Sequence, residues 1–149
     1  MFEKLKRFFQ GEPPPVADII VDPILGSLSW SKDDEAWLSS PEHGGIGFRF
    51  EISGTPQPDE SLLRHAADIS QRREEFVLSV QRFLSEEAAS VRHLSPFKEE
   101  IARLRIERVC LFWPERPDDG MIFFDGGHDY RGWRCDYIGR TPKGLGFDS

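Results

Sequence analysis

The chain has 149 residues, a formal net charge of −7 and a pI near 5.1. A chain of this length can bury a core of its own without disulfides or metals. The acidic balance argues against nucleic acid as a partner, because a phosphate backbone requires a stripe of Lys and Arg. The same acidity is typical of a solvated surface, and it would also attract a basic protein.

The two cysteines, Cys110 and Cys135, fall in predicted strands, which favours buried reduced thiols over a disulfide framework. No run approaches the ~20 apolar residues of a transmembrane helix, and residues 1–10 lack the apolar core of a signal peptide. We therefore expect a cytoplasmic protein.

Residues 1–10 read MFEKLKRFFQ, and their apolar side chains share one helical face. The following GEPPP forms a stiff spacer. We predict an amphipathic helix and Pro-rich spacer over residues 1–18, followed by a single domain over 19–149. This helix could dock on its own domain, on a partner copy, on a larger assembly or on a membrane surface, or it could fray.

Three strands are predicted before the helices, over residues 24–30, 36–38 and 46–52. The last is the clearest, because apolar side chains at 46, 48, 50 and 52 alternate with Gly47, Arg49 and Glu51. This period of two predicts one face in the core and one face in water.

A long amphipathic helix is predicted over residues 59–89, with Asp59 as its N-cap. Arg73 interrupts the apolar stripe; we expect its stem to pack and its guanidinium to reach solvent, and a ligand-binding charge in the core is the alternative. The stripe could also bind a partner helix in a coiled coil, but the apolar faces of the strands favour packing on the sheet. Ser95-Pro96 indicates the start of a short second helix.

Three more strands are predicted after the helices, over residues 109–113, 121–124 and 133–138. The first is continuously apolar and is therefore expected at the centre of the sheet. The tail, 139–149, is rich in Pro and Gly and is expected to be a loop. The fold class is thus α+β, with an antiparallel sheet of about six strands packed against one long and one short helix.

The turn Asp125-Gly126-Gly127-His128-Asp129 is the candidate reactive site. A histidine between carboxylates could ligate a metal or act as a general base, with Asp125, His128 and Asp129 as the residues concerned. The alternative interpretation, which we favour, is a solvated turn formed by Gly and Asp. Elsewhere the sequence holds no recognisable catalytic or cofactor-binding motif, and burial among apolar neighbours would raise the pKa of the Cys110 thiol.

Acidic turns and tryptophans are the candidate partner-binding residues. The four tryptophans are expected mainly to fill the core between sheet and helices, with Trp37 as the one predicted to be exposed. The predicted contact residues for a basic partner are Asp33, Asp34, Glu35, Trp37, Asp118 and Asp119.

The chain resembles a class of small uncharacterised bacterial domains. The resemblance is carried by Asp22-Pro23-Ile24-Leu25-Gly26 leading to Trp30, by 120–124 (GMIFF), by Trp133, and by the ending Pro142…Gly146-Phe147-Asp148. It covers most of the chain after Val21, and its motifs concern packing and turns. Some similar small acidic proteins are immunity proteins, which neutralise a cognate toxin in bacterial competition.

The sequence therefore predicts a protein-binding domain that is not an enzyme and needs no cofactor, and the resemblance suggests an immunity protein with a basic toxin as its partner. The alternatives are a small-ligand or metal-binding domain or enzyme built on the Asp125–Asp129 turn, and an accessory protein that docks on a membrane or assembly through residues 1–10.

Overall fold

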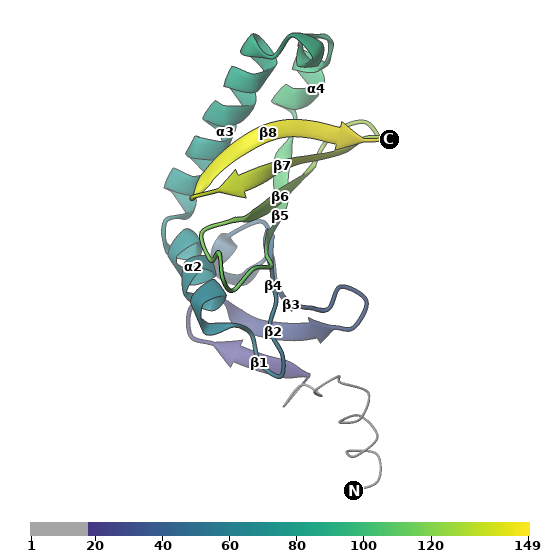
Figure 1. Ribbon diagram of the computed structural model, residues 1–149. Coiled ribbons are helices and arrows are strands. Elements are labelled where there is room, and N and C mark those ends of the chain that lie inside the picture. Colours follow the sequence, from purple (N-terminus) through teal and green to yellow (C-terminus); the bar gives the residue numbers. More distant parts are fainter. Residues whose placement is uncertain (1–17) are drawn as a thin grey trace, which may run out of the picture.

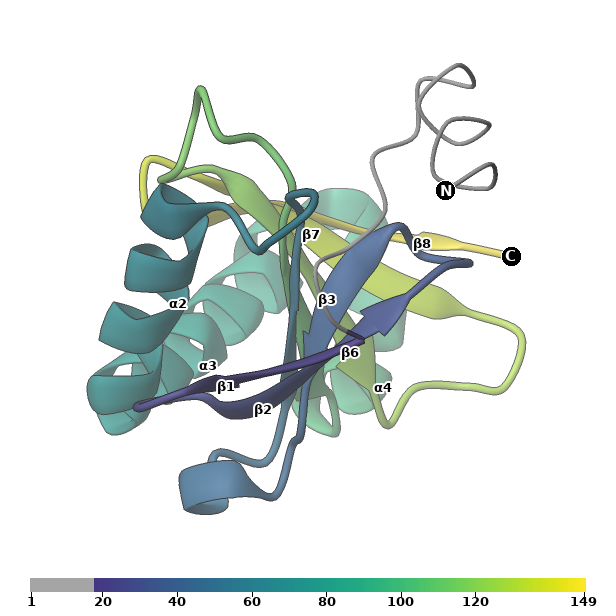
Figure 2. The ribbon, with the colours of Figure 1, turned by 90° about the horizontal axis from the view of Figure 1, so that it is seen from below.

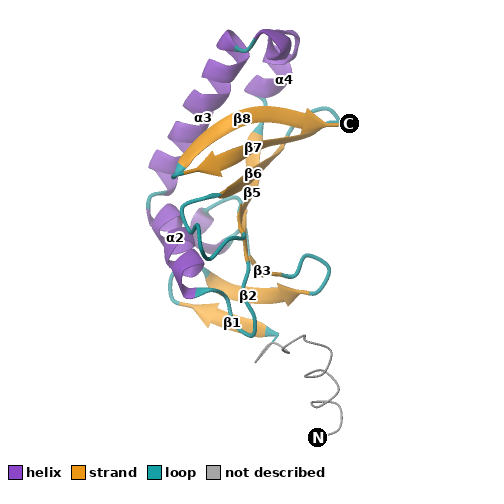
Figure 3. Cartoon of the chain, in the orientation of Figure 1, coloured by secondary structure: helices purple, strands orange, loops and turns teal. Residues whose placement is uncertain are grey.

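The computed structural model describes residues 18–149, so the predicted N-terminal helix and spacer lie outside the described residues. The described part is an eight-stranded sheet with helices packed on it (Figure 1, Figure 3). The α+β prediction is confirmed at this level. The number of strands is eight rather than about six, and the described chain holds three α-helices rather than two.

The strands are β1 (Ile19–Asp22), β2 (Gly26–Ser31), β3 (Ala36–Ser39), β4 (Arg49–Ile52), β5 (Arg105–Leu111), β6 (Gly120–Asp125), β7 (Gly132–Ile138) and β8 (Thr141–Asp148). The helices are α2 (Glu60–Gln71), α3 (Arg73–Ser90) and α4 (Lys98–Ala102), with 3-10 turns η1 (His43–Gly45) and η2 (Arg92–Phe97).

The strands lie in the sheet in the order in which they occur in the chain. All neighbours are antiparallel except β4 and β5, which are parallel. A parallel pair requires a long crossover connection, and here the crossover contains α2, α3 and α4. The sheet therefore consists of two four-stranded meanders joined at the parallel pair.

The long predicted helix is divided into two. Asp59 is the N-cap of α2 as expected, and its carboxylate accepts the Leu62 N–H at 3.1 Å. Helix α2 ends at Gln71. The following Arg72, with φ of −110° and ψ of 34°, is not helical, and α3 begins at the next residue. Because α2 packs on β4 and α3 packs on β8, one straight helix would not follow the twisted sheet.

The second helix and the two edge strands also differ from prediction. Pro96 lies inside η2, and α4 begins at Lys98 rather than at Ser95-Pro96. The tail expected to be a loop forms β8, and β1 precedes the first predicted strand. Both extra strands lie at sheet edges, where Pro and Gly are tolerated because one side needs no ladder hydrogen bonds.

A single core lies between the sheet and the helices. It combines side chains of α2 and α3, such as Leu62 and Val80, with strand residues such as Phe50, Val109 and Ile122. The expected central position of the strand over 109–113 is confirmed by β5. The predicted exposure of Trp37 is wrong: its side chain is fully buried, and its Nε1–H donates to the Gly54 carbonyl at 2.8 Å.

Figures 1 and 2 show α2 and α3 together on one side of the sheet, and no described helix lies on the other side. We call that other side the open face. Because side chains alternate along each strand, it holds the residues between the core positions, such as Leu38, Glu51, Cys110 and Met121, which are cross-strand neighbours.

Candidate functional site: the open face of the sheet

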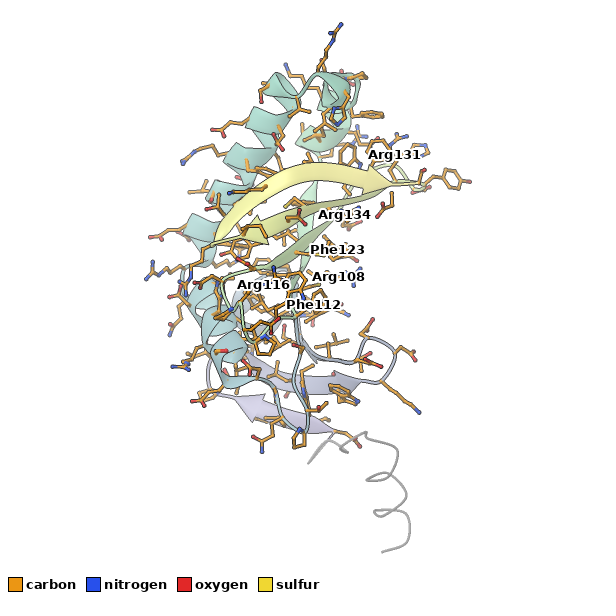
Figure 4. All side chains as sticks on the ribbon, viewed as in Figure 1. Arg108, Phe112, Arg116, Phe123, Arg131 and Arg134 are labelled. Carbon is orange, nitrogen blue, oxygen red and sulfur yellow. The ribbon has the colours of Figure 1, made fainter. Side chains whose placement is uncertain are left out.

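Four cross-strand neighbours form a band over the middle of the open face. Arg49 of β4 pairs with Arg108 of β5, Arg108 with Phe123 of β6, and Phe123 with Arg134 of β7. We call these four residues the arginine band. Figure 4 shows Arg108, Phe123 and Arg134 projecting on the side of the sheet away from α2 and α3. An acidic chain thus gathers arginines on the one face that its helices leave free.

The centre of the band is held in place by its neighbours. The Arg108 guanidinium lies 4.1 Å from the centre of the Phe123 ring, and its Nη1–H donates to Glu51 at 2.9 Å. Glu51 is only 5% exposed, although the strand pattern predicted a solvated position for it. Burial alone would lower the pKa of Arg108, but the hydrogen bond and charge of Glu51 raise it above its usual value.

Two further arginines of the open face are paired with carboxylates. Arg134 donates to both carboxylate oxygens of Asp148, at 2.9 and 3.3 Å. Arg105 donates to Asp125 at 3.0 Å. Arg49 is exposed and forms no ion pair with any residue in the range 18–149.

A cavity of about 540 Å³ lies at one end of the arginine band. Its walls include Arg49, Arg105 and Arg108, and the carboxylates of Asp34, Glu51 and Asp125. The lining of this half-open cavity therefore includes arginines from two adjacent strands.

The predicted acidic contact residues fall into two separate places. Asp33, Asp34 and Glu35 are exposed in the β2–β3 turn, and Asp34 reaches the wall of the open-face cavity. Asp118 instead lies near α2, where it accepts a hydrogen bond from Arg140 at 2.7 Å. Asp119 accepts the Gly139 N–H at 2.8 Å.

The candidate metal-binding turn, Asp125 to Asp129, is engaged in other contacts. Asp125 pairs with Arg105, and the Nδ1 atom of His128 accepts the Tyr130 N–H at 3.3 Å. Among residues 18–149, no three His, Cys, Asp or Glu side chains are placed to share a metal ion, and Asp129 is exposed. The structure therefore does not bring Asp125, His128 and Asp129 together as ligands.

The thiols are buried on opposite faces of the sheet. Cys110 lies on the open face, and its Sγ–H donates to Glu51 at 3.4 Å. Burial, followed by the Glu51 charge, raises the pKa of the Cys110 thiol, which confirms the expected direction and adds a cause that the sequence did not indicate. Cys135 belongs to the core, and burial raises its pKa to about 12.

His65 is the centre of a second polar cluster, on the helix side. Its Nδ1–H donates to the Pro117 carbonyl, and its Nε2 accepts from the Tyr137 hydroxyl at 3.4 Å. Burial lowers the pKa of His65, so the neutral form is favoured. A second, smaller cavity lies beside His65, and there Arg140 forms ion pairs with both Asp118 and Asp68 of α2. These contacts connect the loop before β6 to α2.

Sequence reasoning placed Arg49 on a solvated face but did not identify Arg108, Phe123 and Arg134 as a site. Of these three, only Arg134, which stands between the core residues Trp133 and Cys135, is a polar residue that alternates with the core in its own strand and so gives a signal in the sequence. Arg108 follows the exposed Glu107 at a register irregularity, and Phe123 lies in an apolar run. Their alignment depends on the parallel register of β4 and β5, strands separated by the whole helical crossover. Nothing in either strand alone fixes that register.

No protein-family model matches the chain, and comparisons with curated proteins and with solved structures find no match. No described helix is both long enough and apolar enough to cross a membrane.

Proposed function

We propose that the protein is a non-enzymatic protein-binding domain that docks its partner on the open face. The arginine band is the observation that carries this proposal. Arginine and aromatic residues are enriched in protein interfaces and dominate their binding energy. Here Arg108 stacks on Phe123 and is held by Glu51, so the central contact is already ordered before a partner arrives.

The charge distribution favours a protein over a nucleic acid as the occupant. Three arginines of the open face each pair with a carboxylate: Arg105 with Asp125, Arg108 with Glu51, and Arg134 with Asp148. This pairing removes the uniform positive potential that a phosphate backbone needs. A protein surface, with charges of both signs, is complementary to such a pattern.

The partner that we propose carries a basic surface. The whole chain has a net charge of −7, and residues 1–17 hold three basic and two acidic side chains, so residues 18–149 carry −8. Asp33 and Glu35 extend this charge to the rim of the open face. Long-range attraction would raise the rate at which a basic protein meets the domain. An immunity protein that neutralises a basic toxin is the specific version of this proposal.

Photo-crosslinking tests the docking surface directly. Benzoylphenylalanine at position 123 places a crosslinker within the arginine band, and the same residue in place of Leu78, which is 58% exposed on α3, is the matched control. Both proteins are used to capture partners from the native cells at low and high salt. We expect one basic protein, lost at high salt, to crosslink from position 123 only. Crosslinking of that protein from position 78 alone would place the interface on the helices.

No observation favours the small-ligand or metal alternative over this proposal. Asp125 is already paired with Arg105, and the cavity that it lines belongs to the open face. Docking through residues 1–10 concerns residues outside the described range.

A further inference from the structure

Arg49 and Arg108 place two positive charges side by side. They are directly paired residues of the parallel strands β4 and β5. Like charges at such positions repel and destabilise a sheet unless a counter-charge is present. Arg108 has Glu51 as its counter-charge, whereas Arg49 has none within residues 18–149. Arg49 therefore has no direct ion-pair partner among the described residues, although the carboxylates of Asp34 and Glu107, which also form no ion pair there, line the same cavity.

Three of the four carboxylates around the same cavity accept a hydrogen bond, and two of them, Glu51 and Asp125, form ion pairs with arginines. Glu51 accepts from Arg108 and Cys110, Asp125 accepts from Arg105, and Asp34 accepts from the Ser31 hydroxyl at 2.8 Å. Glu107 is the remaining carboxylate of the lining and is exposed, next to the irregularity in the β5–β6 register. None of these groups forms an ion pair with Arg49.

Arg108 keeps donors for a ligand. A guanidinium has five N–H donors, and Arg108 uses one of them for Glu51. Its stacking on Phe123 fixes its plane. A planar guanidinium with a second one beside it is the arrangement that binds carboxylate or phosphate through several hydrogen bonds.

We propose that this cavity binds an anionic group through Arg49 and Arg108, and that the group is a carboxylate supplied by the partner protein. The inference rests on the proposed function, because it assigns one contact of the same interface. A basic partner would be attracted by the net charge of the domain, while a single acidic side chain at its centre would fix the register of the complex.

Anion titration of the free protein tests the site without the partner. Inorganic phosphate and the blocked tripeptide acetyl-Gly-Glu-Gly-amide are added separately, and the arginine Nε–Hε signals are followed by NMR. We expect the tripeptide to shift the Arg49 signal. We expect Arg49→Gln to weaken binding by about tenfold, the loss of one charge-assisted contact. Arg82→Gln, at an exposed position of α3, should bind as the unmodified protein does.

A further variant tests whether removing a negative charge from the cavity strengthens anion binding. Glu107→Gln removes a carboxylate of the cavity that forms no ion pair within residues 18–149, and it should tighten tripeptide binding by about threefold for a partly screened charge. Equal shifts of the Arg82 and Arg49 Nε–Hε signals, or unchanged tripeptide affinity in Arg49→Gln, would show that this cavity is not the anion-binding site. Binding of phosphate without the tripeptide would overturn the carboxylate assignment. If crosslinking from position 123 succeeds while both anions fail to bind, the docking surface stands and this inference fails.

Discussion

Glu100 illustrates how the domain accommodates a buried charge. It lies in α4, is 7% exposed, and accepts hydrogen bonds from Arg131 at 2.6 and 2.9 Å and from the Trp133 indole. The Arg131 hydrogen bond is the main reason why the pKa of Glu100 falls from 4.5 to about 2. The charge is thereby kept in the folded state. Glu51 on the open face is similarly engaged, by Arg108 and Cys110.

Replacing Glu100 by Gln should lower the free energy of unfolding at neutral pH by about 2 kcal/mol, because charge-assisted hydrogen bonds are lost in a buried place. The pKa of Glu100 is lower in the folded than in the unfolded state, so its contribution is complete above pH 4.5 and is lost as the pH falls from 4.5 towards about 2. Urea unfolding at several pH values measures both effects, and the variant should show a smaller loss over that range.

The exposed neighbour Glu99 provides the control for this experiment. Glu99→Gln should change stability by less than ~0.5 kcal/mol. If Glu100→Gln behaved in the same way, the ion pair with Arg131 would contribute nothing to the fold. The sequence offered no hint of this pair, because Glu100 and Arg131 are 31 residues apart and each is an ordinary charged residue of its own segment.

At the scale of elements, local sequence patterns predicted the structure correctly where that structure depends mainly on the segment's own residues. The alternation over residues 46–52 correctly placed Phe48, Phe50 and Ile52 in the core, and Asp59 was correctly placed at a helix start. Prediction failed where the conformation of a segment depends on pairing with a neighbouring strand. Residues 141–148 contain Pro and Gly and form a strand only because β7 is there to pair with.

The break between α2 and α3 is also determined by tertiary packing rather than by the local sequence. No Pro or Gly lies near Arg72, so the sequence contains no signal for a break. Arg73, the first residue of α3, donates its Nε–H to the Ile46 carbonyl at 2.8 Å. Its guanidinium thus binds the segment before β4, a contact that the sequence did not indicate.

Replacing Arg73 by Met keeps an unbranched apolar stem and removes the donor. We expect the free energy of unfolding to fall by about 1 kcal/mol, the net value of a partly buried hydrogen bond. Chemical denaturation followed by circular dichroism measures this. Arg82→Met is the matched change at an exposed site of the same helix. An equal loss in both variants would mean that the contact with Ile46 does not stabilise the junction.

At the scale of the molecule, the question is whether the two meanders fold as one unit. Only the parallel pair β4–β5 joins them within the sheet. The core provides a second connection, because Phe48 beside β4 and Tyr137 of β7 both pack on Phe76 of α3, with ring centres 5.7 and 5.9 Å apart. Helix α3 therefore joins the two halves through side chains.

Native-state hydrogen exchange tests this cooperativity. Because one core spans both meanders, the slowest ladder amides of β3 and of β7 should exchange only by global unfolding. They should then show the same free energy of opening, and this value should equal the stability obtained from denaturation. Amides of the short edge strand β1, where Val21 is 74% exposed, should exchange faster by local fraying. Protection of β7 exceeding that of β3 by more than ~1 kcal/mol would instead show that the first meander opens independently. In that case the register between Arg49 and Arg108, on which the open-face site depends, would exist only while the first meander is closed.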